Sequence, residues 1–427
     1  MRPIVLAISM FVLNVAAQAP GMALAQTGQA PPDFDLAYVL ATASYCAYAV
    51  GEADADHGEK CAVQCLRVAA ARDSERLDLF RNIEQDSVEA FFDPGAPENA
   101  YLLIQTKIGV VLAFRGTLTP PISPDARFPS AVADAFAKYK EREATMFASF
   151  ISDWKNNFMA IPDPAVGRHP GFDAAWSGLQ AHLIAKDCSP TDCSKFLSFV
   201  SRLQGTASLR LYITGHSKGG ALATLAALDL PGLIGGDIIP VVYTFSATKA
   251  LTVNGAERYA DAAKNMYRFE HQYDIVPNVP PDSTLSPFPA YAHIGSRTFF
   301  AEAQPLQPST EEPVHGVDLP GDKDRLAAAT LKLLPSDSQS SFFDLAELIT
   351  SIQRLSEIDC RSLVDNHFVI FANIQALVHA QHAGAPTTVT EANLNRSFFY
   401  TGLSDSEGAI LWGYSQWCYA LGAAPAK

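Results

Sequence analysis

Short apolar runs alternate along the chain with stretches whose apolar spacing is helical. Runs of this kind are typical of buried strands. They occupy residues 101–105, 109–114, 209–214, 241–245 and 266–269. Helical stretches, such as residues 34–50 and 172–184, lie between most of them. Strands that alternate with helices predict an α/β fold whose sheet is largely parallel.

Two longer stretches interrupt this alternation. Residues 118–149 begin with proline-rich turns and run into a charged helix, whereas residues 301–341 are rich in proline, serine and acidic side chains. Such segments are expected at the surface. The chain has 427 residues, of which 48% are hydrophobic and 18% are charged, so it can bury a large core. We expect one domain over residues 26–427, with these two stretches as insertions.

The first residues, 1–25, have the pattern of a secretion signal. Arg2 supplies a positive start, residues 4–17 form an apolar core, and Ala23 and Ala25 make a small-residue cleavage site. The apolar core is too short to cross a membrane, which takes about 20 residues. We therefore expect a secreted or periplasmic protein whose mature chain has no transmembrane anchor.

Seven cysteines in an exported chain predict disulfides together with one free thiol. A bridge between Cys188 and Cys193 would close a small loop, and one between Cys360 and Cys418 would tie the C-terminal segments together. One cysteine of the remaining three would then stay unpaired; the three are Cys46, Cys61 and Cys65. The spacing of His57, Cys61 and Cys65 is loosely that of a metal site. A disulfide is the commoner outcome, so no metal is expected.

The most informative chemistry lies in residues 209–228. An apolar strand leads into the turn Gly215-x-Ser217-x-Gly219, and an unbroken apolar helix follows. Such a turn is so tight that the residues two before and two after the serine can hardly carry a Cβ. The hydroxyl then projects beside the N–H groups that open the helix, which suits a nucleophile whose transition state develops an oxyanion. The phosphate-loop and dinucleotide-binding glycine patterns are not matched.

A serine nucleophile needs a histidine base, and the base needs an orienting carboxylate. On a scaffold of this type they follow the serine in the order acid, then histidine. Asp274, just past the apolar run 266–269, is the candidate acid, and Glu270 is its competitor. His367 opens an apolar helix or strand and is the favoured base, with His293 as the alternative.

An oxyanion hole needs two donors near the serine. One is expected to be the backbone N–H of Lys218, directly after the nucleophile. The other is expected from Thr117, because the apolar run 109–114 ends in Arg115-Gly116-Thr117, where the glycine permits a close backbone approach. The alternative is a simple strand-ending turn with Arg115 in a structural ion pair.

Four motifs fall in the order seen in the fungal-type (class 3) lipases of the α/β-hydrolase superfamily, which the chain resembles. They are the oxyanion strand and loop at residues 111–117, the lid motif Asp153-Trp154, the nucleophile motif at residues 215–223 and the acid motif at residues 267–281. The resemblance implies an α/β-hydrolase fold with a mostly parallel central sheet. It also implies a triad of Ser217, Asp274 and His367 without a cofactor, and a structural role for His293. The chain departs from the family pattern in its long gaps between Thr117 and the lid motif and between the acid and the base.

A stripe of apolar side chains at helical spacing surrounds the lid motif. It consists of Phe147, Phe150, Ile151, Trp154 and Phe158. On a soluble protein such a stripe usually packs on the core. Its position beside the oxyanion loop and its match to the lid motif favour another interpretation. We hypothesise that this helix covers the serine in water and swings open at a lipid surface.

Together these features predict an exported serine carboxylic-ester hydrolase. The leading interpretation is a lipase that cleaves acylglycerol esters through an acyl-enzyme. The alternatives among hydrolases are a phospholipase A1 and an esterase of plant-wall or polymer esters. A catalytically silent, lipid-binding envelope protein is the alternative outside the enzymes. The formal net charge of −14 argues against nucleic acid as a partner.

Overall fold

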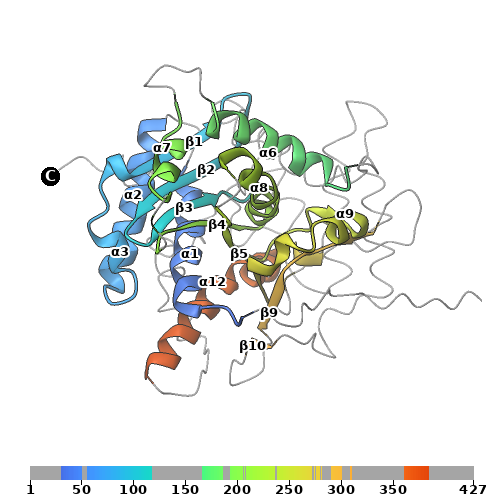
Figure 1. Ribbon diagram of the computed structural model, residues 1–427. Helices are drawn as coiled ribbons and strands as arrows, with labels where there is room; N and C mark the ends of the chain where they lie inside the picture. Colours follow the sequence, from blue (N-terminus) through green and yellow to red (C-terminus); the bar gives the residue numbers. More distant parts are fainter. Residues whose placement is uncertain are drawn as a thin grey trace, which may run out of the picture.

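The computed structural model describes the parts of the chain that build the sheet and its covering helices (Figure 1). The described residues are 30–50, 55–117, 166–185, 193–204, 206, 208–235, 238–271, 274, 276–278, 280, 290–300, 308–309 and 360–383. The secretion signal expected at 1–25 and the lid stripe expected at 147–158 lie outside them. So do both expected insertions, apart from the two residues 308–309.

An eight-stranded sheet forms the centre of the fold, in the order β1-β2-β3-β4-β5-β7-β9-β10. Five neighbouring strands, from β3 to β9, run parallel, and antiparallel pairs flank them on both edges. The strands are β1 (Val88–Asp93), β2 (Ala96–Thr106), β3 (Gly109–Phe114), β4 (Arg210–His216), β5 (Val241–Phe245), β7 (Met266–His271), β9 (Ser296–Phe300) and β10 (Pro308–Ser309). The predicted α/β fold with a largely parallel sheet is confirmed, as is the order of the apolar runs as strands.

Helices cover both faces of this sheet (Figure 1). On one face lie α1 (Phe34–Cys46), α2 (Ala55–Arg72) and α12 (Cys360–Ala383), and on the other α6 (Pro170–Leu183), α7 (Phe196–Ser201) and α8 (Lys218–Ile234). Strand β3 is apolar throughout because helices cover both of its faces. Val111 and Ala113 pack on the first face, whereas Val110, Leu112 and Phe114 pack on the second.

Short elements complete the described chain. They are η1 (Ala47–Ala49), α3 (Asp78–Arg81), η2 (Gln85–Ser87), β6 (Leu251–Thr252), α9 (Val253–Arg258), η3 (Ala262–Asn265), η4 (Val276–Asn278) and β8 (Tyr291–Ala292). Strands β6 and β8 form a separate antiparallel pair. The helix expected over residues 34–50 is α1 followed by the single turn η1, and the helix expected over 172–184 is α6.

Helix α12 is bound to the layer of α1 and α2 through its middle and last turns. Near its end, His379 Nε2 lies 2.6 Å from Asp73 Oδ2, and His382 Nε2 lies 2.9 Å from Asp35 Oδ1. Its middle turns bury Ile370, Phe371 and Ile374 in the core that α1 shares. Apolar packing therefore holds the middle of α12, and polar pairs hold its last turns.

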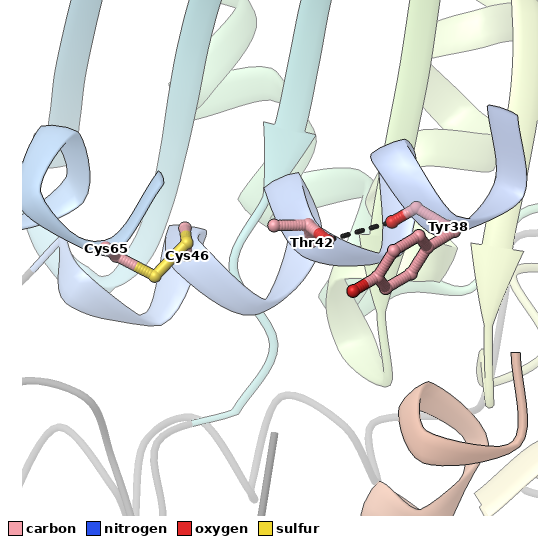
Figure 2. Close-up of a disulfide and its surroundings, with 4 residues drawn as sticks. All are labelled: Tyr38, Thr42, Cys46 and Cys65. Atoms are coloured by element: carbon pink, nitrogen blue, oxygen red, sulfur yellow. Dashed lines mark hydrogen bonds between the residues drawn. A yellow bond between two sulfur atoms is a disulfide. The ribbon is translucent and has the colours of Figure 1, made fainter. Parts of the chain in front are cut away.

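A disulfide joins α1 to α2 (Figure 2). Cys46 at the end of α1 and Cys65 on α2 have their Cα atoms 5.6 Å apart, within the usual range for a bridge. Cys61 and Cys193 also form disulfides. The expectation that one of the three N-terminal cysteines stays unpaired is therefore wrong. Cys61 and Cys65 lie one turn apart on the same helix, and their spacing alone does not show which distant thiol each of them faces.

A charged cluster joins α6 and α8 on the sheet face that these two helices cover. The Arg168 guanidinium donates to both carboxylate oxygens of Asp229, over 2.8 and 2.5 Å, and Trp176 Nε1 donates to the same carboxylate over 2.8 Å. The side chains of Arg168 and Asp229 are 11% and 24% exposed, so solvent screens this pair weakly. Asp229 thereby ties the segment before α6, the helix α6 itself and α8.

We expect the substitution Asp229→Asn to lower the free energy of unfolding by roughly 2 kcal/mol, because it leaves a largely buried guanidinium with only the more exposed Asp173, 3.1 Å away, as a charged partner. Urea unfolding followed by circular dichroism measures this change. Asp261→Asn is the matched control, because Asp261 pairs with Lys264 on the surface with a side chain that is 99% exposed. Equal stabilities of the two variants would contradict a structural role for the buried pair.

Candidate active site

Ser217 lies at the turn between β4 and α8, as the glycine–serine pattern predicts. Its backbone has φ 59° and ψ −129°, a conformation that residues with a Cβ rarely adopt. Its N–H donates to the Phe245 carbonyl over 3.0 Å, and its carbonyl accepts from Gly220 N–H over 2.9 Å. Hydrogen bonds on both sides therefore hold the strained residue, which is 8% exposed.

The glycines around Ser217 are required by close backbone contacts. A Cβ at Gly215 would lie 2.1 Å from the Gly219 carbonyl oxygen, and a Cβ at Gly219 would lie 2.2 Å from the Phe114 carbonyl oxygen. Both distances are shorter than any real carbon–oxygen contact of this kind. The start of α8 therefore packs directly against the ends of β3 and β4.

Asp274 and His367 are in direct contact, although 93 residues separate them. His367 Nδ1 lies 2.9 and 3.1 Å from the two carboxylate oxygens of Asp274, which is 1% exposed. Asp274 follows β7, and its Oδ1 also accepts from Val276 N–H over 3.0 Å. Since a carboxylate only accepts, Nδ1 of His367 carries the proton and Nε2 is left as the basic nitrogen.

His367 lies beside the residue that precedes Ser217. The rings of His216 and His367 have their centroids 4.2 Å apart, and His216 Nε2 lies 3.1 Å from the His367 carbonyl oxygen. His216 ends β4 and is fully buried. Burial and the neighbouring His367 hold the pKa of His216 well below 6.5, so this ring is neutral at physiological pH.

The competing acid and base have other partners. Glu270 pairs with Arg268 and lies 3.9 Å from Arg297. His293 donates from Nε2 to the Pro277 carbonyl over 2.8 Å, and burial together with nearby positive charges lowers its pKa well below 6.5. His293 therefore supports the turn that follows Asp274, in line with the structural role that the family resemblance implies for it.

The segment after β3 lies against the turn at Ser217. Phe114 of β3 pairs with Gly215 of β4, and a Cβ at Gly116 would lie 2.7 Å from the His216 carbonyl oxygen. Thr117, the expected second oxyanion donor, comes directly after this glycine and is 7% exposed. The close approach expected for Gly116 is therefore present.

Two cationic side chains beside the turn are buried, which the sequence did not predict. The Lys218 side chain is 1% exposed, and its Nζ donates to the Glu98 carbonyl and to Asn99 Oδ1, each over 3.0 Å. Arg115 is fully buried, and its guanidinium donates to the Val50 carbonyl. The sequence pattern concerned only the backbone N–H of Lys218, and no local signal marks its side chain as buried.

Within the described ranges, no three His, Cys, Asp or Glu side chains gather in a way that could hold a metal ion. The loose metal-like spacing around Cys61 and Cys65 is explained by their disulfides. A search of the same residues finds no helix with the length and apolar character that crossing a bilayer takes.

The comparisons with known proteins bear on this site. Residues 147–284 match the family model described as lipase (class 3). The resemblance to class 3 lipases is confirmed. The matched range includes Ser217 and Asp274 and ends before His367.

Two curated relatives are similar over part of the chain. Phospholipase A1-Igamma1, chloroplastic, and phospholipase A1-Igamma2, chloroplastic, both of Arabidopsis thaliana, are 27% and 28% identical over 142 and 143 residues. Each match covers 31% of this chain and 27% of the relative, so the chain spans about a quarter of their length.

Solved lipases are among the similar structures. Lipase II of Rhizopus niveus is 17% identical with a TM-score of 0.40, over 71% of this chain and 89% of the lipase. The propeptide complex of Rhizomucor miehei lipase is 16% identical with a TM-score of 0.40, over 65% of this chain and 70% of that one.

We expect Gly219→Ala to unfold the turn locally or destabilise the whole protein, because its Cβ would collide with the backbone of β3. Gly232→Ala is the matched control on the same helix, since a Cβ there has nothing within 4 Å. It should raise the free energy of unfolding by up to roughly 1 kcal/mol, the advantage of alanine over glycine in a helix, and the thermal midpoint should rise slightly with it. Two variants of equal stability would contradict the packing of α8 on β3.

The neutral, buried His216 predicts a specific dependence of stability on pH. The unfolded chain binds a proton at this position below pH 6.5 and the folded chain does not, so wild-type stability falls as the pH falls through that range. The advantage of the wild type over His216→Gln should therefore shrink by about 1.4 kcal/mol per pH unit below 6.5. Urea unfolding of both proteins between pH 7.5 and 5 measures the difference, and a constant gap would contradict a depressed pKa.

Proposed function

We propose that this protein hydrolyses carboxylic esters with Ser217 as nucleophile, His367 as base and Asp274 as the orienting acid. The observation that carries the proposal is the buried Asp274–His367 pair beside the strained turn that presents Ser217. The match to class 3 lipases over residues 147–284 supports the same reaction class.

In the proposed reaction, Ser217 Oγ attacks the ester carbonyl while His367 Nε2 takes the hydroxyl proton. The carboxylate of Asp274 stabilises the imidazolium that forms. The backbone N–H groups of Lys218 and Thr117 hold the oxyanion. His367 then returns its proton to the leaving alcohol. In the second half of the reaction, His367 takes a proton from a water molecule that attacks the acyl-enzyme, and it returns this proton to Ser217 as the carboxylic acid leaves.

The electrostatic setting supports this assignment. The carboxylate of Asp274 is removed from water, so its attraction to a protonated His367 is screened less than at the surface. Helix α8 begins directly after Ser217, and the positive end of its dipole therefore faces the position where negative charge develops. Both features act on the transition state more than on a neutral ester.

The substrate we propose is a lipid ester, with acylglycerols as the first candidate. Phospholipids are the second, because the two curated relatives are named phospholipases A1. We propose that the apolar stripe around Trp154 forms a lid over Ser217 and opens at a lipid–water interface. The signal-like sequence pattern at 1–25 supports export, and so do the disulfides at Cys46, Cys61 and Cys193, since such bonds persist in oxidising compartments.

A series of p-nitrophenyl esters from acetyl to palmitoyl tests the proposed activity on the purified mature chain. We expect hydrolysis that rises with acyl length, and at least about a 10³-fold loss of kcat in Ser217→Ala. Ser177→Ala, an exposed position on α6, is the matched control and should keep the full rate. Parallel assays on emulsified triacylglycerol and on phosphatidylcholine vesicles separate a lipase from a phospholipase A1.

Activity confined to short acyl chains would overturn the lipid substrate and leave an esterase. A folded wild type that hydrolyses none of these esters, with or without emulsified lipid, would overturn the enzymatic proposal. The silent envelope protein would then be the better interpretation.

A further inference from the structure

The two side chains Tyr48 and His216 form a buried connection to the backbone of His367. Tyr48 lies in η1, directly after α1, and its hydroxyl is 2.8 Å from His216 Nδ1. His216 Nε2 is in turn 3.1 Å from the His367 carbonyl oxygen. Both residues are at most 5% exposed. Neither was expected to take part in the site. The pattern Gly-x-Ser-x-Gly leaves position 216 unspecified, and Tyr48 lies outside every motif that pointed to the site.

The partners of His216 determine which of its nitrogens carries the proton. A carbonyl oxygen only accepts, so Nε2 of His216 must be the donor to His367. A neutral imidazole then has Nδ1 as its acceptor, and the Tyr48 hydroxyl must donate to it. The His367 carbonyl therefore fixes the tautomer of His216, and the Tyr48 hydroxyl, which can donate or accept, completes it by donating to Nδ1.

The ring of His216 also contacts the helix that carries His367. Its centroid lies 4.2 Å from the ring of His367, 4.7 Å from Phe368 and 4.8 Å from Phe371. The residue before Ser217 thus contacts both the backbone and the ring of His367. A neutral ring at this place also avoids repelling the imidazolium that His367 becomes during the proposed reaction.

We infer that Tyr48 and His216 are positioning residues that hold His367 in reach of Ser217. The inference rests on the proposed function for the role of His367. Asp274 fixes the ring of His367 at Nδ1, and His216 fixes its backbone, so the base is held from two sides. The Tyr48 hydroxyl acts through His216, because it completes the tautomer of that ring. The ring of Tyr48 also lies 5.9 Å from the ring of Phe368, a contact that Tyr48→Phe keeps.

Kinetics of matched variants test this inference with p-nitrophenyl butyrate. His216→Leu removes both hydrogen bonds and should lower kcat by roughly 10- to 100-fold with KM within about twofold, because a base displaced by about 1 Å loses that much rate. His216→Gln keeps an N–H near the position of Nε2 and should recover kcat to within about fivefold of the wild type. Tyr48→Phe should lower kcat by roughly 3- to 10-fold.

The double variant Tyr48→Phe/His216→Leu distinguishes a chain from two separate effects. If Tyr48 acts through His216, the double variant has the same kcat as His216→Leu within about twofold. Ser44→Ala is the control for lost stability alone. It removes a buried 2.8 Å hydrogen bond between α1 and β4, where Ser44 precedes Tyr48 and Thr214 precedes His216, and should leave kcat unchanged.

The rate at which paraoxon phosphorylates Ser217 separates this inference from the proposed function. The reaction reports activation of Ser217 by His367 whether or not any ester is turned over, and mass spectrometry identifies the labelled residue. The same order of rates is expected, with His216→Leu slowest. The inference is overturned if His216→Leu and Tyr48→Phe lose thermal stability as Ser44→Ala does but keep the wild-type labelling rate. A wild type that labels at Ser217 yet hydrolyses no ester would refute only the proposed function.

Discussion

The close packing of α8 on the ends of β3 and β4 is the constraint on which the described site depends. Gly219 touches the carbonyl of Phe114, and Gly215 touches the carbonyl of Gly219, so neither position tolerates a Cβ. Because α8 starts at this contact, Ser217 must make the whole reversal from strand to helix by itself. Its unusual backbone angles follow from that requirement, and its position at the turn between β4 and α8 follows from those angles.

The same packing places the neighbouring segment. The parallel register pairs Phe114 with Gly215, so the chain that leaves β3 emerges beside the chain that leaves β4. Thr117 and Ser217 are therefore brought to one edge of the sheet by strand pairing. A shift of one residue in this register would turn every side chain of β3 to the opposite face and would separate the two segments.

The base reaches this edge through the opposite layer of the fold. Helix α12 buries Phe371 in the core that it shares with α1, and its last turns pair with Asp35 and Asp73. Helix α1 in turn shares its apolar core with Tyr212 of β4 and is joined to α2 by the disulfide of Cys46. The position of His367 is thus set by a layer whose own attachments lead back to β4, the strand that ends at Ser217.

The features that the sequence predicts well are those with local causes. A tight turn demands glycine wherever it occurs, so Gly215 and Gly219 were identified without knowing what surrounds them. The pairing of His367 with Asp274 has no local cause. The sequence favours His367 over His293 because His367 opens an apolar element, and the family resemblance supports that order. The bridging of Cys46 to Cys65 could not be chosen from the spacing, because the relative placement of α1 and α2 decides it.

The variable positions of the serine motif show a second limit of sequence patterns. Positions 216 and 218 are unspecified in Gly-x-Ser-x-Gly, yet both side chains are buried and hydrogen-bonded. Burying a lysine and a histidine costs free energy unless their polar atoms are satisfied. Their partners Glu98, Asn99 and Tyr48 come from segments distant in the sequence. The burial of these two side chains therefore depends on the tertiary structure and cannot be predicted from the local pattern. Part of the folding free energy is therefore used to hold these groups in place before a substrate arrives, which is the condition under which fixed dipoles lower a barrier most effectively.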